Sequence, residues 1–95
     1  MTVSMIARHK VDDFATWKKG YDGTGQLRKN GGVIASSVHR ALDDPNTVTV
    51  IHQFADESAA RAFRARLDSD EFRAMAKETG IKPETLEAWL LKDVE

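Results

Sequence analysis

The chain has 95 residues, 41% hydrophobic and 31% charged, with 14 basic and 15 acidic side chains and a formal net charge of -1. This length fits one domain over residues 1–95, and the balanced charge argues against a nucleic-acid-binding or membrane-surface protein, which would need a basic excess. The absence of cysteine excludes disulfides and thiolate chemistry. With no signal peptide or membrane-spanning run in the sequence, we expect a cytoplasmic protein.

The first third of the chain predicts a strand and then a helix. Residues 3–10 are rich in β-branched and apolar side chains, which favours a strand. After it, Phe14, Trp17, Tyr21 and Arg28 recur at helical spacing and predict a helix over residues 13–29, closed by the glycines at 31–32. Glycines also stand at 20, 23 and 25, and each costs about 1 kcal/mol relative to alanine, so this helix is expected to be kinked or broken.

The remainder predicts a hairpin, a broken helix and an ambiguous end. Residues 33–40 and 47–54 read as two strands joined by the turn residues at 43–46. Asp56 is a typical cap for a second helix, Ser69 looks like a fresh cap within it, and Gly80 would end it. Residues 85–94 fit either a helix or a last strand.

This order predicts an α+β fold of the ferredoxin-like βαββαβ type. A four-stranded antiparallel sheet would carry two helices, the second one broken, on one face. The strands carry apolar side chains on both sides, so neither face of the sheet reads as polar. Along the chain Met5 alternates with Ile6, Val50 with Ile51, and Leu90 with Trp89. We therefore expect two copies to associate through their sheets as a homodimer.

Two stretches resemble the antibiotic-biosynthesis-monooxygenase-like proteins of the dimeric α/β-barrel superfamily. The similar residues are IARHKV at 6–11, Phe14, WKK at 17–19, YD at 21–22, LRK at 27–29, GGV at 31–33, DPN at 44–46, VIHQF at 50–54, and the alanines 59, 60 and 62 with Phe63. The resemblance implies a strand at 85–91, a homodimer that forms an α/β barrel, and a cavity for a small organic molecule between helices and sheet. Gly23, Thr24 and Gly25 depart from it, since helix formers are expected there.

His9 is the histidine that we favour as a catalytic base. It lies where the first strand meets the helix that carries Tyr21, which could donate a hydrogen bond to a developing enolate. The alternative is a packed or solvated residue at the end of a strand. Substrate-binding side chains are expected among the large ones facing the same space, although such a stripe can equally be core: Phe14, Trp17, His52, Phe63, Met75 and Trp89.

The three histidines do not predict a metal site. His9 and His39 end strands that run in the same direction, whereas His52 ends a strand that runs the opposite way. A strand of this length spans about 25 Å, so one ion cannot reach all three.

The resemblance implies a cofactor-independent monooxygenase that acts on a small aromatic or polyketide-type compound by proton abstraction. A polyketide cyclase or isomerase of the same fold, and a non-catalytic dimeric small-molecule-binding or stress-associated module, are alternatives. Haem degradation is a weaker one, because neither predicted helix holds a histidine to ligate the iron. No nucleic acid or membrane partner is expected.

Overall fold

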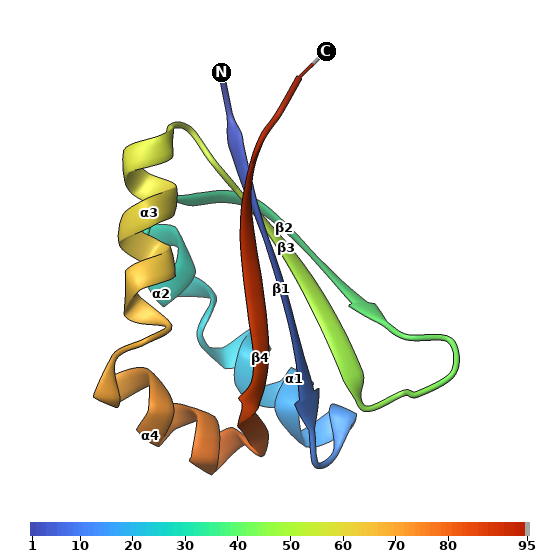
Figure 1. Cartoon of the computed structure of the whole chain (residues 1–95). Helices are drawn as coiled ribbons and strands as arrows, with labels where there is room; N and C mark the ends of the chain where they lie inside the picture. Colours follow the sequence, from blue (N-terminus) through green and yellow to red (C-terminus); the bar gives the residue numbers. More distant parts are fainter. Residues whose placement is uncertain (95) are drawn as a thin grey trace.

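A computed structural model describes residues 1–94 and has four strands and four helices in the order β1-α1-α2-β2-β3-α3-α4-β4 (Figure 1). The strands are β1 (Val3–Val11), β2 (Val33–Arg40), β3 (Thr47–Phe54) and β4 (Ile81–Lys92). They form one sheet in the order β2-β3-β1-β4, and every neighbouring pair is antiparallel. This confirms the ferredoxin-like α+β fold expected from the sequence.

The first helical segment is divided in two, at the glycines that predicted a break. Helix α1 (Phe14–Gly23) begins after Asp13, whose carboxylate accepts a 2.9 Å hydrogen bond from the Thr16 amide. Helix α2 (Gly25–Asn30) follows directly. Between them, the amide of Thr24 donates to the carbonyl of Tyr21 at 3.1 Å, which closes α1. The chain changes direction at this break, directly after the last turn of α1.

The second helical segment is also double, as its capping residues predicted. The Asp56 side chain caps α3 (Glu57–Arg66), and the Ser69 side chain caps α4 (Asp70–Thr79). Gly80 ends α4 with φ of 80°, a left-handed conformation in which glycine is not strained.

The last segment is a strand, and it starts earlier than the expected residue 85. It pairs with β1 and occupies an edge that would otherwise be open. Its register changes along the way, because Arg8 faces Glu87 whereas Lys10 faces Lys82. Strand β4 therefore bulges between residues 82 and 87, and there Thr85 Oγ1 accepts a 2.8 Å hydrogen bond from the Lys10 amide.

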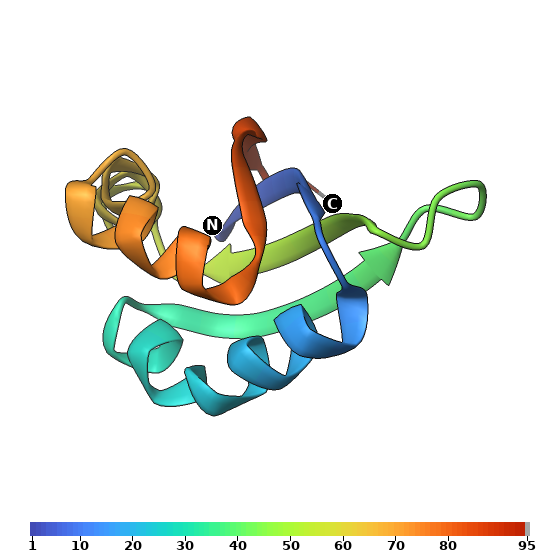
Figure 2. The ribbon, with the colours of Figure 1, turned by 90° about the horizontal axis from the view of Figure 1, so that it is seen from below.

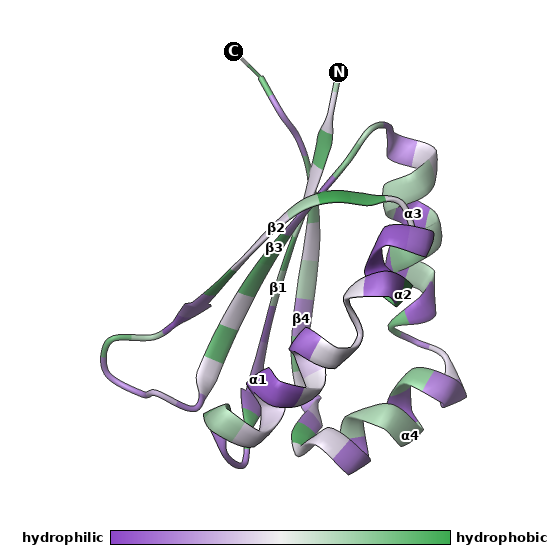
Figure 3. Ribbon diagram, turned by 180° about the vertical axis from the view of Figure 1, so that it is seen from behind, coloured by the Kyte–Doolittle hydropathy of each residue, from purple (hydrophilic) through white to green (hydrophobic). Residues whose placement is uncertain are grey.

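The core lies between one face of the sheet and the helices that cover it (Figure 2). Its buried side chains come from the strands and from α1, α3 and α4, whereas α2 has none. Met5, Val48 and Phe54 are its largest fully buried side chains, and Ala60 and Ala76 bring α3 and α4 close to the sheet. Along the helices hydrophilic and hydrophobic segments alternate, as expected for helices with one buried side (Figure 3). None of these described helices is long and apolar enough to cross a membrane.

The other face of the sheet, which we call the outer face, carries an uncovered apolar strip. Ile6 lies directly opposite Ile51 on β3 and Trp89 on β4, so the three side chains share this face. The exposed fraction is 44% for Trp89 and 45% for Leu91. A single chain thus leaves large apolar groups in contact with water.

Candidate functional site

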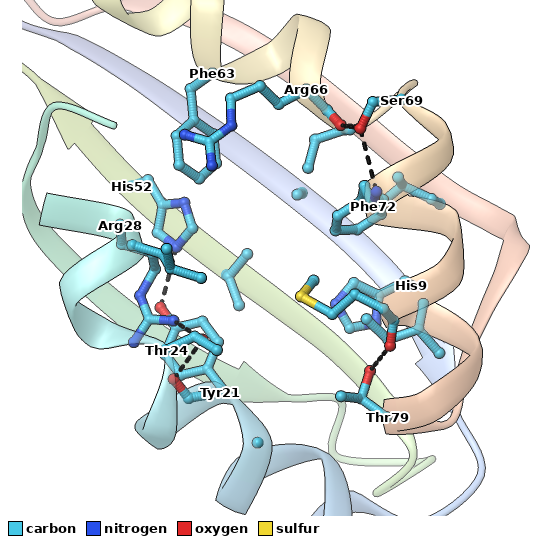
Figure 4. Close-up of a pocket in the computed structure, with 18 of the residues that line it drawn as sticks. His9, Tyr21, Thr24, Arg28, His52, Phe63, Arg66, Ser69, Phe72 and Thr79 are labelled. Atoms are coloured by element: carbon cyan, nitrogen blue, oxygen red, sulfur yellow. Dashed lines mark hydrogen bonds between the residues drawn. The ribbon is translucent and has the colours of Figure 1, made fainter. Parts of the chain in front are cut away.

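A cavity of about 360 Å³ lies between the helices and the inner face of the sheet (Figure 4). Its floor comes from the central strands β1 and β3, and its walls come from all four helices and from β4. The lining residues are Met5, Ala7, His9, Trp17, Gly20, Tyr21, Thr24, Leu27, Arg28, Val50, His52, Phe63, Arg66, Leu67, Ser69, Glu71, Phe72, Met75, Thr79, Ile81 and Leu86. Such a largely apolar space with a few polar groups is typical of a small-molecule site.

The sheet register places two of the three histidines in this cavity. His9 lies opposite Val48, and His52 lies opposite Met5, so both side chains point to the inner face. Residues 5 and 9 of a strand are about 13 Å apart, which puts His9 and His52 toward opposite ends of the sheet, as the sequence predicted. His39 lies opposite Thr49, is exposed, and points to the outer face. Within residues 1–94, no three His, Asp or Glu side chains group as metal ligands.

His9 is buried and neutral. Only 5% of its surface is exposed, and its ring packs edge-on against Trp17 with the ring centroids 5.4 Å apart. Burial lowers the pKa of His9 to about 4, because the charged imidazolium would lose its hydration. Its Nδ1 is buried without a partner, and neither ring nitrogen forms a hydrogen bond within residues 1–94. Its Nε2, which is not fully enclosed, is therefore free to bond a ligand.

His52 is also buried and neutral, and it has a partner. The hydroxyl of Tyr21 lies 3.0 Å from His52 Nε2, which joins α1 to β3. Burial, and secondly the nearby charge of Arg28, lower the pKa of His52 to about 4. His52 Nδ1 has no partner, and an unbonded buried N–H is costlier than an unused lone pair. The favoured tautomer therefore carries its proton on Nε2 and donates it to Tyr21, which leaves the Tyr21 O–H proton free for a ligand.

Arg28 fixes the other side of Tyr21. Its guanidinium carbon lies 3.5 Å from the centre of the Tyr21 ring, in cation–π contact. One guanidinium nitrogen also donates to Thr24 Oγ1 at 2.9 Å, and that hydroxyl donates to the Tyr21 carbonyl at 3.0 Å. The break between α1 and α2 thus holds Arg28 flat against the phenol.

Aromatic rings form a continuous side of the cavity. His9 contacts Trp17, which contacts Tyr21 at a centroid distance of 5.0 Å. Tyr21 and His52 are nearly parallel, with an interplanar angle of 22°, and His52 contacts Phe63 edge-on at 5.4 Å. Ring faces of this kind suit a planar aromatic ligand.

The cavity lining includes six of the eight side chains that sequence analysis singled out: His9, Trp17, Tyr21, His52, Phe63 and Met75. Phe14 is not among the lining residues and packs between Trp17 and Arg40. The placement of Trp89 in the wall was wrong, because Trp89 lies opposite Ile6 and so faces outward. Tyr21 was expected beside His9, but its hydrogen bond is to His52.

Sequence reasoning missed the basic side chains of the lining. Arg28 shares the helical stripe of Trp17 and Tyr21, so its spacing was a usable signal. No sequence signal indicated Arg66, because this residue lines the cavity only as a result of the close approach of α3 to α2. There, a Cβ built on Gly31 would lie 2.9 Å from a guanidinium nitrogen of Arg66.

Residues 12–78 match the model of the family described as antibiotic biosynthesis monooxygenase. No curated protein matches the chain.

Several solved structures share the fold. SnoaB, a cofactor-independent oxygenase from Streptomyces nogalater, has a TM-score of 0.70 and 21% identity, over 99% of this chain and 94% of SnoaB. A monooxygenase from ActVA-Orf6 of Streptomyces coelicolor, in complex with the ligand Nanaomycin D, has a TM-score of 0.66 and 20% identity, over 98% and 88% of the two chains. Rv0793 from Mycobacterium tuberculosis has a TM-score of 0.69 and 15% identity, over 100% and 97%.

Proposed function

The chain belongs to the antibiotic biosynthesis monooxygenase family, and we propose that it is a cofactor-independent monooxygenase acting on a small aromatic compound of polyketide type. The observation that carries this proposal is His9. It is a neutral imidazole with a free ring nitrogen, set in an apolar cavity of about 360 Å³ beside flat aromatic walls. The imidazole accepts a proton at Nε2, from an acidic phenol or an activated carbon, in the tautomer that carries its own proton on Nδ1. That tautomer leaves the buried Nδ1–H without a partner and is the costlier of the two, so it is formed for the reaction.

The reaction would begin when His9 takes a proton from the ligand. This leaves an electron-rich carbanion or phenolate, whose negative charge raises the pKa of the adjacent imidazole and so favours the transfer. The anion gives electrons to dioxygen and a carbon–oxygen bond forms, and the resulting peroxide anion takes the proton back from His9 to become a hydroperoxide. Loss of water from a CH–OOH group then leaves a carbonyl, so one oxygen atom enters the product and the other leaves as water.

Tyr21 would stabilise the charge that develops on the ligand oxygen. Its free O–H proton can donate to that oxygen, while His52 holds the phenol in position from behind. The donors are fixed before the reaction, by the 3.0 Å bond to His52 and by the stacked Arg28. The apolar lining would exclude water, which strengthens these interactions and protects the anion from reprotonation.

We also propose that the working form is a homodimer. The outer face leaves Ile6, Ile51 and the 44%-exposed Trp89 in one strip, and a second copy of the same face would cover it. The cavity opens on the other side of the sheet, so dimerisation would leave it accessible.

The test is turnover of a panel of phenols and anthrone-type compounds, followed by oxygen uptake and product mass under labelled dioxygen. We expect one labelled oxygen atom in the product, and a loss of at least about 100-fold in rate for His9→Gln. The matched control is His39→Gln, which replaces an exposed histidine on the outer face. Turnover that continues without oxygen would indicate a cyclase or isomerase instead, and an unchanged rate for His9→Gln would refute the role of His9.

A further inference from the structure

Charge is unevenly distributed in the cavity. Its lining holds only three charged side chains, namely Arg28 from α2, Arg66 from the end of α3 and Glu71 from α4. Both histidines are neutral near pH 7. With two guanidinium groups and one carboxylate, the lining therefore carries a net positive charge.

Neither guanidinium has an acidic partner. Within residues 1–94, ion pairs join Arg8 to Glu87, Lys18 to Asp22, Arg61 to Glu57 and Arg64 to Asp68, but none includes Arg28 or Arg66. Arg61 and Arg64 belong to the same helix as Arg66, so acidic partners are within reach of α3. Arg40 and Arg73 also form no ion pair among these residues, but they do not line the cavity, whereas Arg28 and Arg66 do.

Both arginines are held by contacts that leave most of their N–H donors unused. The guanidinium of Arg28 stacks on the Tyr21 ring at 3.5 Å and uses one N–H donor in its hydrogen bond to Thr24. Arg66 lies 5.6 Å from the centre of the Phe63 ring, and one of its nitrogens closely approaches Gly31 at the end of α2. Figure 4 shows Arg28 beside Tyr21 on one wall and Arg66 over Phe63 on the next. A guanidinium has five donors in a planar fork that matches a carboxylate.

We propose that Arg28 and Arg66 form a subsite for a carboxylate, so that the ligand is an aromatic acid whose ring system lies along the aromatic wall. This deepens the proposed function and rests on it only in that the cavity must bind a ligand. Glu71 sets the orientation, because its negative charge repels the carboxylate toward the α2 side. The acid group would lie at the Arg28 end of the cavity, on the side of His52 and Tyr21, and the far end of the ring system would extend toward His9.

The test compares two probes of nearly equal shape, 2-naphthoate and the neutral 2-naphthamide, by isothermal titration calorimetry on the full chain. We expect the dissociation constant to be at least about tenfold lower for the acid than for the amide. Arg28→Gln and Arg66→Gln should each remove most of this preference, by weakening binding of the acid far more than binding of the amide. Retained binding of the amide also shows that each variant is folded.

Arg61→Gln is the matched control, because Arg61 lies on α3 and its side chain is 67% exposed. It should leave both affinities unchanged. Equal affinity of the wild-type protein for acid and amide would overturn the subsite while leaving the proposed function standing. Failure of both probes to bind would overturn the subsite and count against the cavity as a ligand site. A clear preference for the acid without any oxygen-dependent turnover of aromatic acids would support the subsite and refute the monooxygenase.

Discussion

The phenol of Tyr21 and the imidazole of His52 are joined by a 3.0 Å hydrogen bond between a helix wall and the floor of the cavity. Each residue is also constrained on its other side, Tyr21 by the stacked Arg28 and His52 by Phe63. The pair therefore has a fixed geometry before any ligand binds, and a ligand need not arrange it.

Replacing Tyr21 with Phe removes the hydroxyl and keeps the ring. We expect the free energy of unfolding to fall by about 1 kcal/mol, since a buried hydrogen bond is lost and His52 is left unbonded. Turnover should fall by about 10²–10³, the usual effect of losing one donor to an oxyanion. Urea denaturation and steady-state rates measure the two effects.

His52→Gln gives the double-mutant cycle for this pair. If the two residues act together, the effects of Tyr21→Phe and His52→Gln on turnover should be clearly less than additive. Additive effects, or a rate that Tyr21→Phe does not change, would contradict the role given to the pair.

Stability should fall as the pH drops from about 6.5 to about 4. Burial lowers the pKa of His9 and of His52 in the folded protein from the ordinary 6.5 to about 4, so the unfolded chain takes up protons first as the pH falls. The loss is complete below the folded pKa and on the order of 3 kcal/mol for each histidine. Urea denaturation at intervals from pH 7.5 to pH 4.5 measures it.

His9→Gln should make the free energy of unfolding depend less steeply on pH. His39→Gln should leave this dependence unchanged, because His39 is exposed. Carboxylates contribute only at the low end of this window. Hydrogen bonds hold the pKa values of Asp13, Asp44, Glu57 and Asp93 below the ordinary range, so their stabilisation begins to be lost below about pH 5. The change in stability above about pH 5 therefore reports the histidines. A wild-type stability independent of pH across the window would show that these histidines are not desolvated.

Two glycines, one at the end of α1 and one at the end of α2, should respond to alanine in opposite ways. At Gly31, a Cβ would lie 2.8 Å from a ring carbon of Phe63, so Gly31→Ala should destabilise the protein by about 1–3 kcal/mol. At Gly23, no atom lies within 4 Å of the added Cβ, and Gly23→Ala should stabilise the last turn of α1 by about 0.5–1 kcal/mol. Thermal and urea denaturation compare the two, and equal effects would contradict the packing described at Gly31.

Trp89→Glu places a charge in the middle of the outer face. Sedimentation equilibrium should give twice the 10.6 kDa chain mass for the wild type and the single-chain mass for this variant at micromolar concentration. Lys77→Glu introduces the same residue at an exposed position of helix α4, and this variant should remain a dimer. A well-folded wild-type protein of single-chain mass would refute the dimer.

The sequence predicted the elements well because each one depends on local signals. Asp56 and Ser69 are capping residues and Gly80 ends a helix, and all three act where their spacing indicated. The placement of β4 needed more, since the pattern of residues 85–94 suits a helix as well as a strand. The open edge of β1 decides between them, and that edge exists only in the assembled sheet.

The site was predicted as a set of residue types but not as a set of contacts. The opposite directions of β1 and β3 were enough to place His9 and His52 toward opposite ends of the sheet. It did not reveal that Tyr21 bonds His52, because that depends on how far α1 extends along the sheet. Arg66 was unpredictable for the same kind of reason, since its place is set by the distance between two helices.

The bulge in β4 shifts the phase of that strand. In an unbroken strand, Ile81 and Leu86 would point to opposite sides, because their numbers differ by an odd count. The looped-out residues reverse the alternation, and both side chains line the same cavity. Deleting a single residue from this loop would make the side chains at one end of β4 point to the opposite face of the sheet. Removing or adding two residues would keep each side chain on its present face and alter only the size of the cavity.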